Sequence, residues 1–416
     1  MSELRSQAER MIQAVIAENM PQAAVIKALQ ERDFAGKKVV LVAIGKAAYT
    51  MAKAAHDFLG AQISRGVVVT KYDHAGEAIG NLDIYEAGHP TPDENTVLAS
   101  QKALAAVSGL TEQDQVLFLV SGGGSALFEA PKAGVTLEML VDITNQLLSS
   151  GADIVEINIL RKRLSQVKAG GFAQLCQPAQ VFAIVLSDVL GDRLDTIASG
   201  PAAPDLSTVE EAMSIVHKYK LTLPQVALEY LQQETPKTVT NVDTLITGSV
   251  KSLCTSAAKA AQGFGFKPYI LSTTLNSDAA QAGKFLAQMA ADTHRGETFF
   301  EKPCALIVGG ETVVQLTGTG KGGRNQELAL AAAKGIAGHS ETLVFSLGSD
   351  GTDGPTDAAG GMVDEQTANL LKVKGHNIDA VLSNNDSYNS LKLVDGLIMT
   401  GPTGTNVNDV TVVLCR

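Results

Sequence analysis

The chain has 416 residues, of which 45% are hydrophobic, and a formal net charge of −11 at pH 7. Its length favours two or three domains, and its apolar fraction excludes a disordered or fibrous protein. The acidic balance makes nucleic acid and an anionic membrane poor partners, because both bind basic surfaces.

The cysteines and the first residues are typical of a protein of the reducing cytoplasm. Four cysteines lie far apart in the sequence without a Cys-x-x-Cys pair, which suggests neither a zinc site nor a disulfide framework. Residues 1–20 form a charged amphipathic pattern without the apolar core of a signal peptide. No apolar run reaches the ~20 residues of a membrane span. We therefore expect a cytoplasmic protein that spans no membrane.

Short apolar runs that end in a glycine corner recur along the chain, and a helical pattern follows. They begin at Val39, Val116, Ala305 and Leu343. Continuous aliphatic runs of this kind are typical of strands buried on both faces, as in parallel sheets covered by helices. The predicted class is therefore α/β. A polar stretch at residues 232–237 suggests a boundary between domains at residues 1–237 and 238–416.

Two glycine corners in the first half are candidate anion sites, because ligands of such folds bind beyond the carboxyl ends of the strands. Lys46 follows a strand-ending glycine at the start of a predicted helix, where it can bind a phosphate or simply be solvated. The loop Ser121-Gly122-Gly123-Gly124-Ser125 follows the strand VLFLV, and its backbone can cradle a phosphate or a carboxylate. A tight turn would use the same residues, so both interpretations stay open.

A carboxylate and a cationic segment follow in the chain. Asp188 ends the predicted strand IVLSD, where it suits a metal ligand or a general base, although capping of a turn would also place it there. Arg161, Ser165 and Lys168 share one face at helical spacing. In an acidic protein such a face can clamp an acidic substrate, or it can be a solvated surface.

The second half contains a Gly-x-Gly-x-x-Gly pattern at Gly318–Gly323, between a predicted strand at residues 312–316 and a predicted helix. This is the arrangement of a dinucleotide-binding fingerprint. However, Lys321 and Arg324 place cations where such loops use the backbone, and the next strand-end acid, Asp350, lies beyond the usual ~20 residues. The cationic loop suits a transferring phosphoryl group better.

Two later loops are rich in side-chain oxygens. The loop at residues 347–357 carries three carboxylates after a predicted buried strand, which suits Mg²⁺ or a polyol acid, and it lacks the twelfth-position glutamate of a calcium loop. The loop at residues 400–409, which includes Asn406, can hold a nucleotide or substrate, or form a turn. We interpret His89, in the loop Gly88-His89-Pro90, as structural.

Together these loops resemble the class II glycerate 2-kinase family, which has a MOFRL-type C-terminal domain and whose relatives are sometimes labelled hydroxypyruvate reductases. The resemblance covers nearly the whole chain, and the order and spacing of the segments are specific. The matching segments are Ala43–Ala47, Gly88–Pro90, Ser121–Ser125, Ser187–Val189, Ser199–Pro201, Gly309–Glu311, Gly322–Glu327, Ser349–Gly354 and Gly401–Asn406.

The resemblance implies ATP-dependent phosphorylation of D-glycerate at its 2-hydroxyl. It also implies a Rossmann-like α/β/α N-terminal domain with a mostly parallel sheet, a smaller α/β C-terminal domain, and a site in a cleft between them. Lys46 and Arg324 match the cationic catalytic positions of the family. Asp188 and Asp350 match acids of the same site, where they would hold Mg²⁺ or orient the attacking hydroxyl.

From the resemblance we expect ATP and Mg²⁺ as cofactors, D-glycerate as substrate, and a chain able to form a homodimer. The residues expected to contact substrate or nucleotide are Ser121, Gly122, Gly123, Gly124, Ser125, Arg161, Glu311, Asn325 and Asn406. The main alternative is an NAD(P)H-dependent reductase of hydroxypyruvate or tartronate semialdehyde that uses the loop at Gly318. A third is a sugar-acid binding protein without catalysis.

Overall fold

The computed structural model describes residues 2–187, 189, 191 and 193–416. The chain forms two compact units, one from Ala24–Thr247 and the other from Gly248–Arg416 together with the first 23 residues. Strand β6 (Val242–Gly248) belongs to the sheet of the first unit. The domain division expected at residue 237 stays a prediction.

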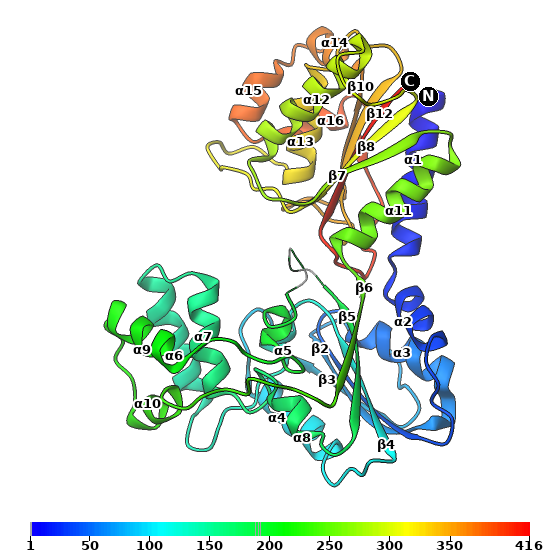
Figure 1. Ribbon diagram of the computed structural model, residues 1–416. Helices are drawn as coiled ribbons and strands as arrows, with labels where there is room; N and C mark the ends of the chain where they lie inside the picture. Colours follow the sequence, from blue (N-terminus) through cyan, green and yellow to red (C-terminus); the bar gives the residue numbers. More distant parts are fainter. Residues whose placement is uncertain (1, 188, 190, 192) are drawn as a thin grey trace. The chain divides into compact units, whose positions relative to one another are not determined.

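The first unit is built on a six-stranded sheet (Figure 1). Its strand order is β3 (Leu82–Ala87), β2 (Ile63–Lys71), β1 (Lys38–Ile44), β4 (Asp114–Val120), β5 (Gln180–Leu186) and β6. The neighbours from β3 to β5 pair in parallel. The predicted α/β class with a mostly parallel sheet is therefore confirmed.

Helices cover both faces of this sheet, which explains why its strands read as continuous apolar runs. In β1, Val40 and Val42 point into the same core as helix α4 (Glu94–Ala106). Val39 and Leu41 point into the opposite core, with helix α3 (Ala48–Leu59). Both faces are therefore dry, and no polar alternation remains in the strand.

A group of helices beside the sheet has a core of its own (Figure 1). It comprises α6 (Leu137–Ser149), α7 (Ile154–Leu164), α9 (Val209–Lys218) and α10 (Gln225–Leu231). Helix α7 begins at a capping box, in which the Asp153 carboxylate accepts the Glu156 N–H at 2.9 Å and the Glu156 carboxylate accepts the Asp153 N–H at 3.1 Å. It ends at Leu164, because Ser165 is already extended.

Two further short helices lie near the glycine loop. They are α5 (Gly124–Leu127) and α8 (Gly171–Leu175). Phe128, directly after α5, packs edge-on against Phe172 of α8, with ring centroids 5.3 Å apart, and both side chains are fully buried. This aromatic contact anchors the chain that leaves the glycine loop.

The second unit contains a mostly antiparallel six-stranded sheet. Its order is β11 (Leu397–Ile398), β10 (Gly360–Asp364), β9 (Thr342–Gly348), β12 (Asp409–Cys415), β8 (Cys304–Gly310) and β7 (Lys267–Leu275). Only β7 and β8 pair in parallel. Strands β8 and β9 both run antiparallel to β12, which lies between them, so their carboxyl ends meet the start of β12 at one edge.

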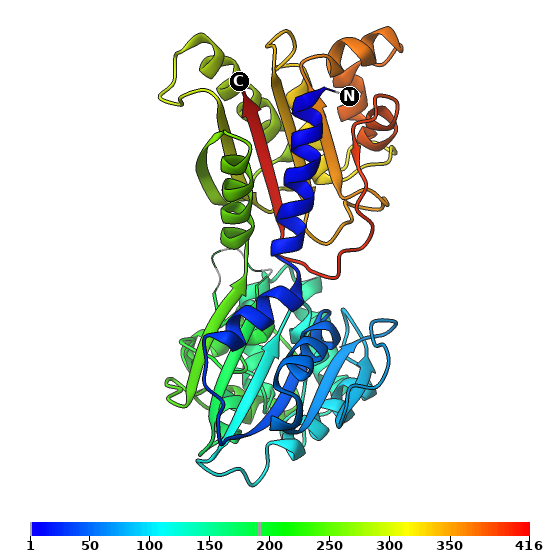
Figure 2. The same ribbon diagram turned by 90° about the vertical axis from the view of Figure 1, so that its right-hand side faces the viewer.

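The helices of the second unit are α1 (Glu3–Glu18), α11 (Val250–Gly263), α12 (Ala279–Arg295), α13 (Arg324–Ala333), α14 (Thr367–Val373), α15 (Ile378–Ser383) and α16 (Ser387–Lys392). Helix α1 lies along this sheet, next to α11 (Figure 2). The Arg5 side chain of α1 binds Asp364 at 2.6 Å, which fastens the N-terminal helix to β10. In the part of the chain that the structure describes, no helix has the length and apolar character needed to cross a membrane.

Candidate functional site

The glycine loop Ser121–Ser125 is joined to the loop that follows β1. Strands β1 and β4 pair in register up to their last residues, so the two loops emerge side by side. Ser121 Oγ accepts the Ala47 N–H at 3.0 Å and donates to the Ile44 carbonyl at 3.2 Å. The Lys46 N–H donates to the Gly122 carbonyl at 2.9 Å. The two predicted anion sites of this unit therefore form one structure.

The N–H groups of residues 122–125 take part in no hydrogen bond with another described residue. Gly123 adopts φ +85° and ψ −2°, a left-handed conformation that costs glycine little. Successive N–H groups around such a turn converge on a concave site for an anion. The loop is therefore able to bind a carboxylate or phosphate through its backbone.

His89 and Lys46 lie against this loop. A Cβ at residue 123 would lie 2.9 Å from Nε2 of His89 and 3.3 Å from Cε of Lys46. Burial lowers the pKa of His89, and the nearby Lys46 lowers it further. The imidazole is therefore neutral at neutral pH, and one ring nitrogen can accept a proton. His89 is thus a candidate site residue that the sequence interpretation assigned to structure.

Arg161 and Lys168 meet at the other end of the loop, although the prediction of one shared helical face is wrong because α7 ends at Leu164. Arg161 Nη2 donates to the Ser125 carbonyl at 3.1 Å, and Lys168 Nζ donates to the same carbonyl at 2.9 Å. Glu129 lies within 3.7 Å of Arg161 and 3.3 Å of Lys168. The loop therefore has two cations fixed beside it.

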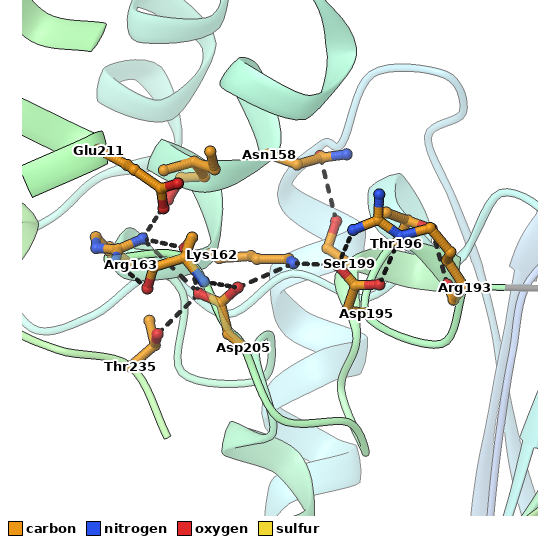
Figure 3. A network of polar contacts seen from close by, with 12 residues as sticks. Asn158, Lys162, Arg163, Arg193, Asp195, Thr196, Ser199, Asp205, Glu211 and Thr235 are labelled. Atoms are coloured by element: carbon orange, nitrogen blue, oxygen red, sulfur yellow. Dashed lines mark hydrogen bonds and ion pairs between the residues drawn. The ribbon is translucent and has the colours of Figure 1, made fainter. Parts of the chain in front are cut away.

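The other cations of α7 bind a different carboxylate, Asp205 (Figure 3). Asp205 is buried and lies 3.2 Å from Lys162 and 3.7 Å from Arg163. Hydroxyl groups of Ser207 and Thr235 donate to the same carboxylate. The network borders a cavity of about 840 Å³, and none of the predicted site residues that the structure describes lines it. Lys162 and Arg163 are thus held by Asp205, away from the glycine loop.

In the second unit, Arg324 is held at the edge where β8 and β9 end and β12 begins. It is the first residue of α13. Its Nε and Nη2 bind the two oxygens of Asp409 at 2.6 and 3.0 Å, and its Nη1 binds Glu311 at 3.1 Å. Burial alone would lower the pKa of Arg324, but its hydrogen bonds to Asp409 raise it. The guanidinium is therefore permanently charged and fixed in orientation.

Asp350 shares this edge with Asp409. A Cβ added to Gly348 would lie 3.4 Å from Oδ1 of Asp350 and 3.4 Å from Oδ1 of Asp409. The glycine at 348 thus leaves room for two carboxylates, but Asp409 is engaged by Arg324. Among the described residues, no three His, Cys, Asp or Glu side chains are grouped as a resident metal site. Asp188, the other predicted metal ligand, lies outside the described residues.

Asn325 supports this arrangement from inside the protein. Its side-chain amide donates to Asp353 at 3.3 Å and accepts the Ser346 hydroxyl at 2.6 Å. Burial raises the pKa of Asp353 to about 6, although N–H groups of Gln326 and Asn325 oppose this shift. Asn406, also predicted as a contact, is half-buried on its loop, and its side-chain oxygen accepts the N–H of Asn408.

The Gly-x-Gly-x-x-Gly loop is packed against residues 384–387, and the predicted strand at 312–316 is wrong. In place of that strand the structure has an isolated bridge at Val313. A Cβ at Gly318 or Gly320 would lie within 2.5 Å of Asn384 backbone atoms. The N–H groups of residues 317–321 donate to Asn384, Asn385 and Asp386. Gly318 and Gly320 permit this close packing, and their N–H groups are already used.

Two of the residues missed by the sequence interpretation have recognisable signals. Asp409 is the first residue of the terminal strand, directly after a glycine-rich loop, and pairs in register with Gly310 and Gly348. His89 stands in a loop with glycine and proline on either side. Glu129 has no signal, because its neighbours in the sequence are those of a buried turn.

Comparison with known proteins identifies the family. The DUF4147 family, described as a domain of unknown function, matches residues 7–232, and the MOFRL family matches residues 304–409. The D-glycerate 2-kinase of Thermotoga maritima is 52% identical over 375 residues, which are 90% of this chain and 90% of that protein. The chain belongs to the glycerate kinase family.

A solved structure and a second relative support this placement. A crystal structure of the glycerate kinase of Thermotoga maritima matches with a TM-score of 0.96 at 49% identity, over 99% of both chains. A protein of Agrobacterium vitis that bears the name hydroxypyruvate reductase is 39% identical over 385 residues, 91% of this chain and 99% of that protein. The predicted family and its alternative label are both confirmed.

Proposed function

We propose that the protein is an ATP-dependent kinase that phosphorylates the 2-hydroxyl of D-glycerate. The observation that carries the proposal is the fixed Arg324 guanidinium, held by Asp409 and Glu311 at a strand edge. Phosphoryl transfer depends mainly on positioning and on neutralising charge, so a guanidinium held in one orientation suits it. The 52% identical relative named D-glycerate 2-kinase supports the same activity.

The substrate carboxylate is assigned to the glycine loop Ser121–Ser125. Free backbone N–H groups of residues 122–125 and the Arg161 guanidinium supply the donors that a carboxylate needs. His89 and Lys46 stand on the same loop and are therefore candidates for contact with the hydroxyl groups of the bound acid. A neutral His89 can accept the proton that the attacking hydroxyl releases.

The transferred phosphoryl group is assigned to Lys46 and Arg324. Lys46 follows strand β1, Arg324 begins helix α13, and each matches a cationic catalytic position of the family. Mg²⁺ is proposed to arrive with ATP as the MgATP substrate. Asp350 or Asp188 would contact that ion or orient the hydroxyl. A cytoplasmic location and a homodimer stay predictions.

The reductase alternative meets an obstacle in the loop at Gly318. A dinucleotide fingerprint binds pyrophosphate through free backbone N–H groups that follow directly after a strand. Here the N–H groups of residues 317–321 already donate to Asn384, Asn385 and Asp386, and β8 ends at Gly310. The geometry therefore favours the kinase.

Parallel assays on one preparation test the proposal. The first measures release of ADP from ATP and Mg²⁺ with and without D-glycerate, and the second measures oxidation of NADH with hydroxypyruvate. We expect release of ADP that depends on glycerate and no oxidation of NADH. Oxidation of NADH without release of ADP would overturn the kinase in favour of the reductase. Binding of glycerate with neither reaction would indicate a non-catalytic binding protein.

A further inference from the structure

The buried carboxylate of Glu129 has an unusual environment. Its side chain is fully buried, and neither oxygen accepts a hydrogen bond from a described residue. A buried carboxylate without donors is costly unless cations compensate it. Lys168 Nζ lies 3.3 Å away and Arg161 Nη2 lies 3.7 Å away. The compensation is therefore electrostatic and comes from these two side chains.

Both of these cations also bind the glycine loop. Lys168 Nζ donates to the carbonyls of Ser125 and Phe128 at 2.9 and 3.0 Å, and Arg161 Nη2 donates to that of Ser125 at 3.1 Å. Lys168 is fully buried, whereas 15% of the Arg161 side chain stays exposed. Arg161 is therefore the member of the group that a ligand can reach.

The charges of this group do not cancel. Within the described part of the chain, Glu129 is the only acidic ion-pair partner of either Arg161 or Lys168. Two cations thus share one carboxylate, and one positive charge remains beside the loop. One carboxylate of a bound acid would neutralise it.

We infer that Glu129 is a positioning residue for substrate binding. It holds Arg161 and Lys168 against the Ser125 carbonyl, so that the glycine loop keeps its shape and a single positive charge faces the carboxylate of the substrate. This inference rests on the proposed function, because it takes the loop Ser121–Ser125 as the carboxylate site. Glu129 itself touches no substrate and acts through the two cations.

The matching control is Asp205. It is also a buried carboxylate that lies 3.2 and 3.7 Å from two cations of the same segment, Lys162 and Arg163 (Figure 3). Those cations make no contact with the glycine loop among the described residues. Glu129→Gln and Asp205→Asn therefore remove comparable ion pairs, but only the first disturbs the loop.

The test compares the two variants with the wild-type protein in steady-state kinetics. For Glu129→Gln we expect the KM for D-glycerate to rise about tenfold, with the KM for ATP unchanged and kcat reduced less than threefold, since positioned charge-assisted hydrogen bonds to the substrate are lost. Asp205→Asn keeps the glycerate KM within twofold. An unchanged or lower KM in Glu129→Gln, or an equal rise in Asp205→Asn, would overturn the inference.

The pH dependence of kcat/KM distinguishes the positioning role from a simple loss of stability, because a loss of stability alone would not shift it. Burial lowers the pKa of Lys168 to about 8, although Glu129 raises it, and Arg161 lowers it further. The kcat/KM for glycerate should therefore fall as the pH rises through about 8 in the wild type. In Glu129→Gln the fall should begin at a lower pH, because the group that raises this pKa is gone. Coincident profiles would contradict the positioning role.

Amide hydrogen exchange separates this inference from the proposed function. If the wild-type protein does not phosphorylate glycerate, the proposed function fails, but the loop can still be tested. We expect faster exchange at residues 126–128, whose N–H groups donate to the carbonyls of Gly123 and Gly124, in Glu129→Gln than in Asp205→Asn, at equal global stability. Equal exchange in the two variants would show that Glu129 does not hold the loop.

Discussion

Gly123 offers a sharp test of the glycine loop as a binding site. Its backbone has φ +85°, so any L-residue there costs about 1–2 kcal/mol of left-handed strain. A Cβ would also stand 2.9 Å from Nε2 and Cδ2 of His89 and 3.3 Å from Cε of Lys46. In Gly123→Ala, the imidazole or the loop must therefore move.

Gly151 provides the matched control for that strain. It has φ +78°, and a Cβ there would meet no atom within 4 Å. We expect Gly151→Ala to lose about 1–2 kcal/mol of stability in urea unfolding, and Gly123→Ala to lose at least as much. A displacement of about 1 Å at a reacting group can cost ~100-fold in rate, so kcat/KM for glycerate should fall about that much in Gly123→Ala.

Activity in Gly151→Ala should stay within twofold of the wild type. Urea unfolding followed by circular dichroism confirms that both variants are folded at the assay temperature. If Gly123→Ala retained kcat/KM within threefold of Gly151→Ala, the loop and His89 would not form the substrate site. An equal loss of activity in both variants would show that backbone strain alone, without contact with His89, explains the loss.

Three further predictions follow from the second unit. Arg324→Lys keeps the charge but cannot bind Asp409 with two donors, so kcat should fall about 10²–10³-fold while KM changes little, and a near-normal kcat would remove the guanidinium from the mechanism. Asp353 has a pKa of about 6 in the folded chain, above the 3.8 of free Asp, because of burial, so the native state binds its proton more tightly than the unfolded state. Its contribution to stability should be largely present at pH 4 and lost by pH 7, a change of about 2 kcal/mol relative to Asp353→Asn. Equal pH dependence of urea unfolding in the two proteins would contradict this. Gly318→Ala should destabilise the protein by several kcal/mol, because its Cβ would stand 2.4 Å from Asn384 backbone atoms, and NADH should not raise the Tm of the wild type; stabilisation by NADH would revive the reductase.

The buried strands could be predicted from the sequence because their signal is local. Aliphatic runs that end at glycine became β1, β4, β8 and β9, and the α/β class followed from them. The antiparallel pairing of β8 and β9 with β12 could not be predicted, because pairing depends on partners far away in the chain. The packing of α1 in the second unit could not be predicted either, because its partners also lie far away in the chain.

The grouping of candidate residues was predictable where a motif carried its own geometry. The corners at Lys46 and at Ser121–Ser125 lie together because parallel strands end at one edge of the sheet. Helical spacing wrongly placed Arg161 and Lys168 on one face of a helix. The helix ends between them, and the two side chains come together because both pair with Glu129. The loop at Gly318 had the right spacing of glycines, but its packing against Asn384 depends on tertiary contacts.

The central claim is that a phosphoryl group moves from ATP to the 2-hydroxyl of D-glycerate. Phosphorus NMR of the protein with ATP, Mg²⁺ and D-glycerate tests it most directly, because the spectrum reports both transfer and the position of the new ester. We expect the γ-phosphate signal to decline as the signal of 2-phosphoglycerate grows. An unchanged ATP spectrum, or a signal of 3-phosphoglycerate alone, would contradict the account.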